Sequence, residues 1–340
     1  MNLQDVRPEA QDARRWSKIL ARYKQPHTGR GVVEIVITLI PFVLFWAAAA
    51  VALQHEYWAG LLFALPAAAF LVRMFMIQHD CGHGAFVDSR SGNDWIGRFI
   101  GVLTLTPYDF WKRTHNLHHA NSGALERRGF GDVDTLTVSE FRALRRFDRL
   151  RYRLYRNPVV MFVLGPVYVF LLQHRLPVGF MNQGWNPWLS TMSTNAGIVL
   201  ASGAVIWFTG LGAFLAIHLS VTLLAGAAGI WLFYVQHQFE HTSWDREKDW
   251  NWHEAALHGS SYYRLPSILR WLTANIGMHH IHHLSSRIPY YRLPDVLSDH
   301  PELKDINTLS LMDSLRCVRL VLWDEEGRRL VSFKDAGAMA

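Results

Sequence analysis

The chain has 340 residues, of which 50% are hydrophobic and 18% are charged, and its formal net charge is +6. It is too apolar for a typical soluble domain of this length and too charged for a bundle buried entirely in a bilayer. We therefore expect membrane spans joined to a sizeable polar cap. Cys81 and Cys317 are the only cysteines, which excludes a cysteine-ligated iron–sulfur cluster and a disulfide framework.

Residues 1–31 are polar and charged, with no apolar core followed by a cleavage site. We therefore expect no secretory signal peptide here, and we predict an N-terminal tail.

Residues 35–53 and 59–77 form the first predicted pair of membrane spans. The first run has 19 residues without a charge, enough to cross a bilayer as a helix. Arg73 is the only charge in the second run, and a long side chain near the end of a span can reach the interface. The link at 54–58 is so short that the two helices form a hairpin.

A second pair of spans is predicted between residues 196 and 236. This run has 41 residues without Asp, Glu, Lys or Arg, twice the length of one span. Gly210 and Gly212 offer a turn, so we predict helices at 196–213 and 216–236. Residues 158–173 form a weaker apolar run of 16 residues, which we assign to an interfacial helix.

Lys and Arg residues predict the orientation, because cytoplasmic loops carry an excess of them. The N-terminal tail contributes, among others, Arg14, Arg15, Lys18, Arg22 and Lys24. Those clustered between the two hairpins include Arg127, Arg128, Arg142, Arg145, Arg146, Arg149, Arg151, Arg153 and Arg156. We therefore place this central segment, the N-terminal tail and a C-terminal tail at 301–340 on the cytoplasmic side of a bacterial inner membrane.

Three groups of histidines have a spacing that points to chemistry. His79 and His83 are four residues apart and share one helix face. His115, His118 and His119 follow at i, i+3 and i+4, and the same pattern returns at His279, His282 and His283. His280 falls off that face. All three groups lie just beyond a predicted span or in the predicted cytoplasmic segments.

Neutral imidazole is a good ligand for iron, and two histidines on one helix face can reach the same metal ion. Eight histidines from three helices can hold two metal ions and leave positions open for oxygen. His237 and His241, four residues apart at the end of the last predicted span, are candidates for the remaining ligands. The other scattered histidines are better explained as ordinary polar residues: His27, His55, His174, His218, His253, His258 and His300.

The three groups resemble the histidine boxes of the membrane fatty acid desaturases, closest to the acyl-lipid type. The surrounding sequence is similar as well: HDCGHGAF at 79–86, WKRTHNLHH at 111–119, FYVQHQFE at 233–240 and NIGMHHIHHL at 275–284. The likeness covers residues 35–300. It implies an all-α polytopic membrane protein with four transmembrane helices in two hairpins, interfacial helices and a cytoplasmic, histidine-rich cap that holds a di-iron centre.

The resemblance also implies the reaction. Two iron ions activate oxygen, two hydrogens leave adjacent methylenes of a lipid acyl chain, and the expected position is mid-chain or methyl-side (delta-12/omega-6-like). The implied ligands are His79, His83, His115, His118, His119, His237, His279, His282 and His283. Glu240 and Asn275 are alternatives to His241 for the remaining coordination, and they are also candidates, with Asp80 and Asn116, for residues that orient the ligands. Cys81 is expected to be inert, and Asp132 and Asp134 match a family segment without an assigned role.

Electrons have to come from a separate protein, such as a ferredoxin or cytochrome b5, because the chain shows no dinucleotide fingerprint and no haem-binding extension. The arginines at 142–156 can receive an acidic carrier or bind anionic lipid headgroups. The aromatic residues at 107–111, 231–234, 244–252 and 262–263 can line an acyl tunnel or anchor the protein at the interface. No nucleic-acid partner is expected.

Two alternatives stay open on the sequence. One is a related di-iron lipid hydroxylase or carotenoid oxygenase, since similar boxes serve those reactions. The other is a histidine-rich metal-binding or transport protein, although transport usually needs polar groups inside the spans and the predicted hairpins have almost none.

Replacement of His118 by Ala tests the histidine groups directly. We expect the variant to insert into the membrane at the wild-type level and to form no product, because one metal ligand is lost. Lipid analysis and membrane fractionation of the same cells measure both. Retained product formation would contradict the proposed metal centre.

Overall fold

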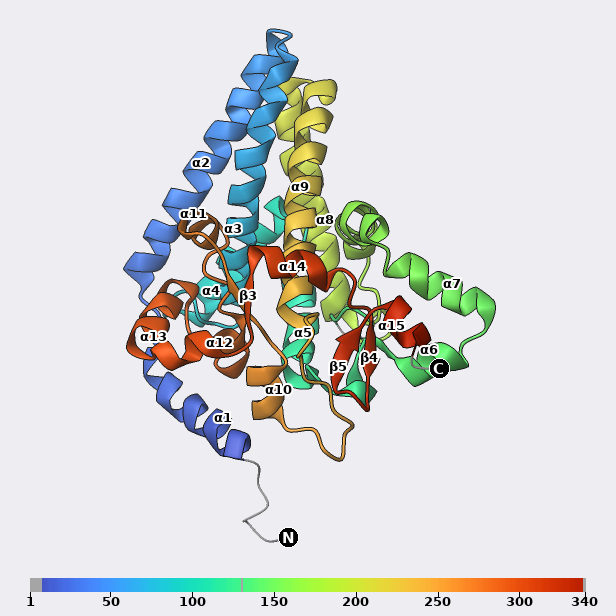
Figure 1. The fold of residues 1–340 in the computed structure, drawn as a ribbon. Helices are drawn as coiled ribbons and strands as arrows, with labels where there is room; N and C mark the ends of the chain where they lie inside the picture. Colours follow the sequence, from blue (N-terminus) through green and yellow to red (C-terminus); the bar gives the residue numbers. More distant parts are fainter. Residues whose placement is uncertain (1–7, 130, 339–340) are drawn as a thin grey trace.

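Helices make up most of the computed structural model, which describes residues 8–129 and 131–338 (Figure 1). Four long apolar segments extend together beyond the rest of the molecule at one end. They are α2 (Thr28–Gln54), η2 with α3 (Trp58–Phe63 and Ala64–Gly82), α8 (Trp185–Thr209) and α9 (Leu211–His237). Each is long and apolar enough to cross a membrane.

The first two long segments match the predicted runs at 35–53 and 59–77, and each extends beyond its prediction at both ends. The chain reverses between Gln54 and Trp58, and α2 packs against α3. The second reversal is at Gly210, where φ is +78°. Glycine adopts this backbone conformation without the steric cost that a side chain adds.

Helix α8 begins at Trp185, eleven residues before the predicted start at 196, and ends four residues before the predicted end at 213. Its first three turns carry hydroxyl groups instead of aliphatic side chains, which hid them from the hydropathy pattern. Thr191 and Thr194 are buried and donate hydrogen bonds to the helix carbonyls of Pro187 and Ser190, at 3.0 and 2.9 Å. The hydroxyls are therefore satisfied inside the helix.

The segment predicted as an interfacial helix forms two π-helical turns, η4 (Val160–Leu164) and η5 (Val167–Leu172), followed by η6 (Gln173–Arg175). It meets α7 (Arg146–Tyr155) at an angle of 61°. Gly226 on α9 permits a close approach, since a Cβ there would lie 2.9 Å from Cβ of Pro166. The segment therefore packs against α9.

The cap consists of short elements around the lower ends of α3 and α9 in Figure 1. Its helices before the second long pair are α1 (Pro8–Ile19), η1 (Leu20–Tyr23), α4 (Arg90–Leu103), α5 (Tyr108–Asn121), η3 (Leu125–Arg127) and α6 (Val138–Ala143). Those after it are α10 (Trp252–His258), α11 (Ser267–Leu272), α12 (His279–Leu284), η7 (Tyr290–Arg292), α13 (Leu293–Asp299), η8 (Pro301–Asp305), α14 (Leu311–Cys317) and α15 (Phe333–Ala338).

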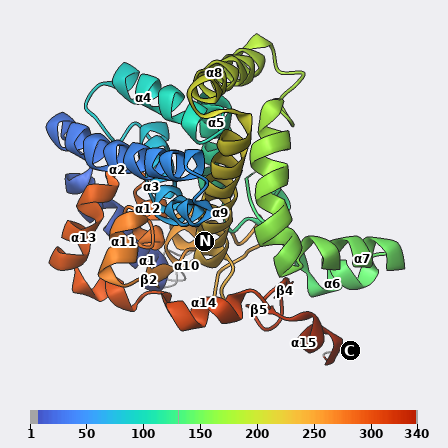
Figure 2. The same cartoon turned by 90° about the horizontal axis from the view of Figure 1, so that it is seen from above.

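Two small sheets connect distant parts of the chain. Strand β1 (Leu136–Thr137) pairs in parallel with β4 (Leu322–Asp324), which pairs antiparallel with β5 (Arg329–Val331). Strand β2 (Tyr262–Arg264) pairs in parallel with β3 (Thr308–Ser310). Figure 2 shows β4, β5, α6, α7 and α15 gathered at one side of the long helices.

Both predicted tails are folded where the structure describes them. Trp323 on β4 is 1% exposed, and the Tyr234 hydroxyl of α9 donates to the carbonyl of Leu320 at 3.0 Å. Helix α1 packs against α10, and Ala13 and Leu20 are fully buried. Residues 13–31 and 301–338 are therefore built into the cap.

We expected the Arg73 side chain to reach the membrane interface, but it is buried inside the protein. Its side chain is 2% exposed and forms an ion pair with Glu34 of α2, which is 1% exposed. Arg73 also donates to the Thr38 hydroxyl at 3.1 Å and to the carbonyl of Trp271, and the Tyr290 hydroxyl donates to Glu34 at 3.0 Å. A charge buried among apolar helices needs such partners, so this cluster joins the first helix pair to the cap.

Replacement of Arg73 by Met should destabilise the protein by about 3–5 kcal/mol, because it leaves the Glu34 carboxylate buried without its cation. The matched control is Arg316→Ala, which removes the exposed Arg316–Asp313 pair, and its cost should be about 0–1 kcal/mol. Unfolding of both variants in the same detergent measures the difference. Equal stability of the two variants would show that the buried pair does not hold the cap in place.

Candidate metal centre

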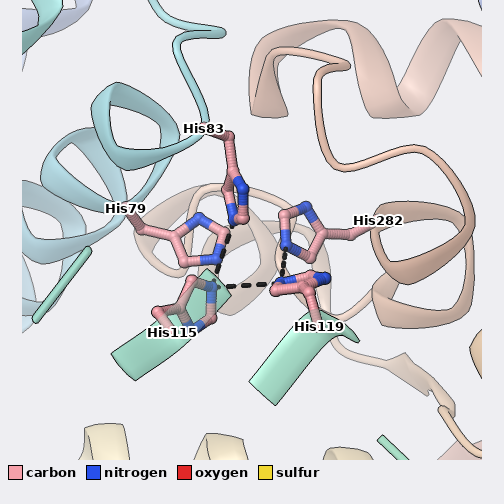
Figure 3. A group of neighbouring side chains, drawn as sticks. All are labelled: His79, His83, His115, His119 and His282. Atoms are coloured by element: carbon pink, nitrogen blue, oxygen red, sulfur yellow. Dashed lines mark hydrogen bonds between the residues drawn. The ribbon is translucent and has the colours of Figure 1, made fainter. Parts of the chain in front are cut away.

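Five histidines form the first group, and Figure 3 shows their rings pointing toward one another. The members are His79 on α3, His83 just after it, His115 and His119 on α5, and His282 on α12. The Nε2 atoms of His83, His115, His119 and His282 follow one another in that order, each 3.1 Å from the next. One ligand atom from each of the five lies within 4.8 Å of all the others.

Four buried histidines form the second group, within the same 4.8 Å limit. They are His118 on α5, His237 at the end of α9, and His279 and His283 on α12. Nε2 of His118 lies 3.2 Å from Nε2 of both His237 and His283. Nε2 of His279 lies 3.0 Å from Nε2 of His237.

Helical periodicity explains how two groups arise from three-histidine patterns. On α5, His115 and His119 are four residues apart and join the first group, whereas His118 joins the second. On α12 the roles are reversed, since His279 and His283 join the second group and His282 joins the first. Each helix therefore lies between the two groups and supplies histidines to both.

Metal coordination accounts for the arrangement of the nine histidines better than hydrogen bonds between their imidazole rings do. Burial, followed by the proximity of other imidazoles, holds the pKa well below its ordinary value for six of them, which are His83, His115, His119, His279, His282 and His283. A neutral imidazole has one N–H, so one proton at most lies between two facing Nε2 atoms. His79 Nε2 is buried and has no hydrogen-bond partner among the described residues. A cation between the lone pairs satisfies all of these atoms.

Contacts behind the histidines hold the rings in place. Asp132 and His118 Nδ1 form a hydrogen bond, and Asp80 Oδ1 lies 3.2 Å from His79 Nδ1. His237 Nδ1 lies 3.2 Å from the carbonyl of Gly259. Such contacts fix the tautomer that leaves Nε2 free for a metal. No role for Asp132 could be predicted, because its loop comes near α5 only in the folded chain.

Three of the other predicted residues do not join the groups. His241 is exposed, because α9 ends at His237 and the backbone at Gln238 leaves the helical conformation, so helical spacing no longer applies. Glu240 is exposed with its carboxylate 3.8 Å from Arg329, and Asn116 is exposed on α5.

Asn275 acts at a distance from the histidines. Its amide donates to the carbonyl of Tyr290 at 3.1 Å, and the Tyr290 N–H donates to Asp80 at 2.6 Å. His280 points away from the helix face shared by His279, His282 and His283, as expected, and its Nε2 lies 3.0 Å from the carbonyl of Leu303.

A cavity of about 800 Å³ opens onto the metal centre, between α3, α5, α9 and the segment from η4 to η6. His79, His115 and His279 form part of its wall, and most of the remaining lining is apolar. Phe110, Trp111 and Phe233, which belong to the aromatic segments predicted to line an acyl tunnel, also line this cavity. The aromatic residues at 244–252 and 262–263 do not line this cavity.

The fold and these groups define a helical membrane protein with two sites able to hold metal ions. Residues 56–307 match the family model described as fatty acid desaturase. A fatty acid desaturase of Bacillus subtilis is 41% identical over 94% of this chain and 90% of its own length. The chain belongs to the fatty acid desaturase family.

Two Synechocystis proteins are more distant relatives. The sn-1 acyl-lipid omega-3 desaturase (ferredoxin) is 28% identical over 65% of this chain and 61% of its own length. The sn-1 oleoyl-lipid 12-desaturase is 28% identical over 66% of this chain and 63% of its own length. Membership of this family implies an oxidoreductase of lipid metabolism.

Replacement of Asp132 by Asn should weaken metal binding by about 10–100-fold, because His118 loses the carboxylate that orients it. The control is Asp134→Asn in the same loop, a carboxylate without a hydrogen bond to a ligand histidine. Metal content after dialysis against graded chelator concentrations measures the affinity. Equal retention in both variants would exclude this role for Asp132.

Proposed function

We propose that the chain is a membrane-bound fatty acyl desaturase with two iron ions. It uses O₂ and two external electrons to introduce a double bond into the acyl chain of a lipid. A mid-chain or methyl-side position is supported by the two Synechocystis relatives, which are named as an omega-3 desaturase and a 12-desaturase.

The observation that carries the proposal is the position of the histidine groups at one wall of an apolar cavity. Nine imidazoles in groups of five and four suit iron, and a carboxylate behind one group raises the basicity of its histidine. Bound iron would supply the activation of oxygen that removes hydrogen from an unactivated methylene.

The residues of the chain position the substrate. An acyl chain in the cavity lies along α9 and contacts Phe233, Ile230 and Gly226, so apolar burial holds it there. Trp111 stacks on His115 with ring centroids 4.7 Å apart and forms the wall beside the first group. This wall excludes water and brings two adjacent methylenes next to the histidines.

The proposed membrane arrangement has α2–α3 and α8–α9 as two hairpins, with the metal centre and both termini on the cytoplasmic side of a bacterial inner membrane. Two of the ligand-bearing helices, α3 and α9, end at the cap with His79 and His237 near their ends. The lysines and arginines of the connecting segments support this sidedness.

Expression in a host that lacks polyunsaturated lipids tests the function. We expect acyl chains that are lighter by two hydrogens, and lipid mass spectrometry with location of the double bond measures them. A gain of one oxygen atom would indicate hydroxylation. Purified protein that contains zinc and shows no oxygen-dependent activity would indicate a metal-binding role instead.

A further inference from the structure

Two basic surfaces of the cap differ in what surrounds their charges. On α7, exposed arginines alternate with exposed apolar side chains: Phe147 is 69% exposed, and Leu150 and Leu154 are each 52% exposed. The exposed apolar surface continues at Val159 and Val163 beside the long helices. An amphipathic helix of this kind fits a lipid surface with anionic headgroups.

Helix α1 carries a basic surface of a different kind. Arg14, Arg15 and Lys18 are exposed, and none forms an ion pair with another described side chain. Residues 1–31 contain seven Lys and Arg against three Asp and Glu. Within the described part of 13–31, no large hydrophobic side chain is exposed. Such a surface fits an acidic protein better than the interior of a bilayer.

Charged residues of the loop before α10 form ion pairs with residues of other segments. Glu247 forms an ion pair with Arg127, and Arg246 forms ion pairs with Glu126 and Glu325 at 3.3 and 2.8 Å. These pairs neutralise the loop before α10. Arg14, Arg15 and Lys18 form the exposed basic group of α1.

A short path leads from this surface to the metal centre. Helix α1 packs against α10, where the partly exposed Trp252 donates its indole N–H to the carbonyl of His119 at 3.1 Å. The rings of Trp252 and His253 are 4.9 Å apart, and burial and then the nearby Arg14 lower the pKa of His253. Trp252 therefore links the helix that packs against α1 to the backbone of His119.

We propose that an acidic one-electron carrier protein docks on α1 and α10, and that its electron passes through Trp252 and His119 to the metal centre. This proposal rests on the proposed function. Both helices lie at the end of the molecule opposite the far tips of the long helices (Figure 1). A carrier bound there has access from the aqueous phase.

Each docking event would oxidise one carrier by one electron and pass that electron through Trp252 to the histidines that would hold the iron ions. Two such electrons and two protons from solvent join the two electrons and two protons of the broken C–H bonds. Together they reduce one O₂ to two waters while the double bond forms.

Charge reversal at α1 tests the docking surface. In protein reconstituted in nanodiscs of zwitterionic lipid, the variant Arg14→Glu, Arg15→Glu and Lys18→Glu should bind purified [2Fe–2S] ferredoxin about tenfold more weakly at low salt. Its ratio of ferredoxin-supported to dithionite-supported product formation should fall by a similar factor. The matched control reverses Arg146, Arg149 and Arg151 on α7 and should bind ferredoxin within about twofold of wild type.

Unchanged ferredoxin affinity in the α1 variant would overturn the docking surface, and so would an equal loss in the α7 variant. If ferredoxin binds as expected but dithionite supports no product even in the wild type, the proposed function fails and the docking surface stands.

Substitution at Trp252 tests the route. Reduction of the iron-loaded protein by bound ferredoxin, followed by stopped-flow absorbance, should slow about tenfold or more in Trp252→Leu and less in Trp252→Phe, which keeps an aromatic ring. The control is Trp250→Phe, whose parent indole donates to the carbonyl of Ser122 at 3.0 Å instead of to a ligand histidine. Equal rates in Trp252→Leu and wild type would overturn the role of Trp252.

Discussion

Buried imidazole nitrogens that face one another are the constraint on which this structure depends. Nine Nε2 atoms meet in two groups, and protons alone cannot satisfy them, because each neutral ring carries a single N–H. The groups draw on α3, α5, α9 and α12, so the surrounding elements have to hold four helix segments in register. The ion pair of Glu34 and Arg73, the Tyr290 contacts and the C-terminal strands all fix the cap against the long helices.

Local spacing along a helix was enough to predict eight of the nine histidines, and His237 was predicted from its place at the end of the last span and from the resemblance. The intervals at His79, His115 and His279 required only helical geometry, and all nine implied ligands lie in the two groups. The division between the groups was not predicted, since the spacing identifies one broad face and does not show that two sites share it. His241 was misplaced for a related reason: its spacing from His237 has helical meaning only if the helix continues, and α9 stops at His237.

Features that depend on long-range contacts could not be predicted from local patterns. Arg73 looked like a residue that reaches the interface because hydropathy along one helix carries no information about Glu34 on the neighbouring helix. The segment after residue 300 looked like a tail because its strands are short and find their partners far away in the sequence, at β1 and β2. The role of Asp132 was hidden because its loop meets α5 only after folding.

The parallel pairing of β1 with β4 has a consequence for the order in which the protein is assembled. Strand β1 precedes the second long helix pair, whereas β4 is among the last parts of the chain to leave the ribosome. The sheet beside α7 therefore closes only after all four long helices have been synthesised. Contacts between residues so far apart in the sequence form late in folding. The entropy lost on closing the loop between them is offset only when the contacts themselves have formed. A nascent chain halted before Trp323 therefore has no completed sheet.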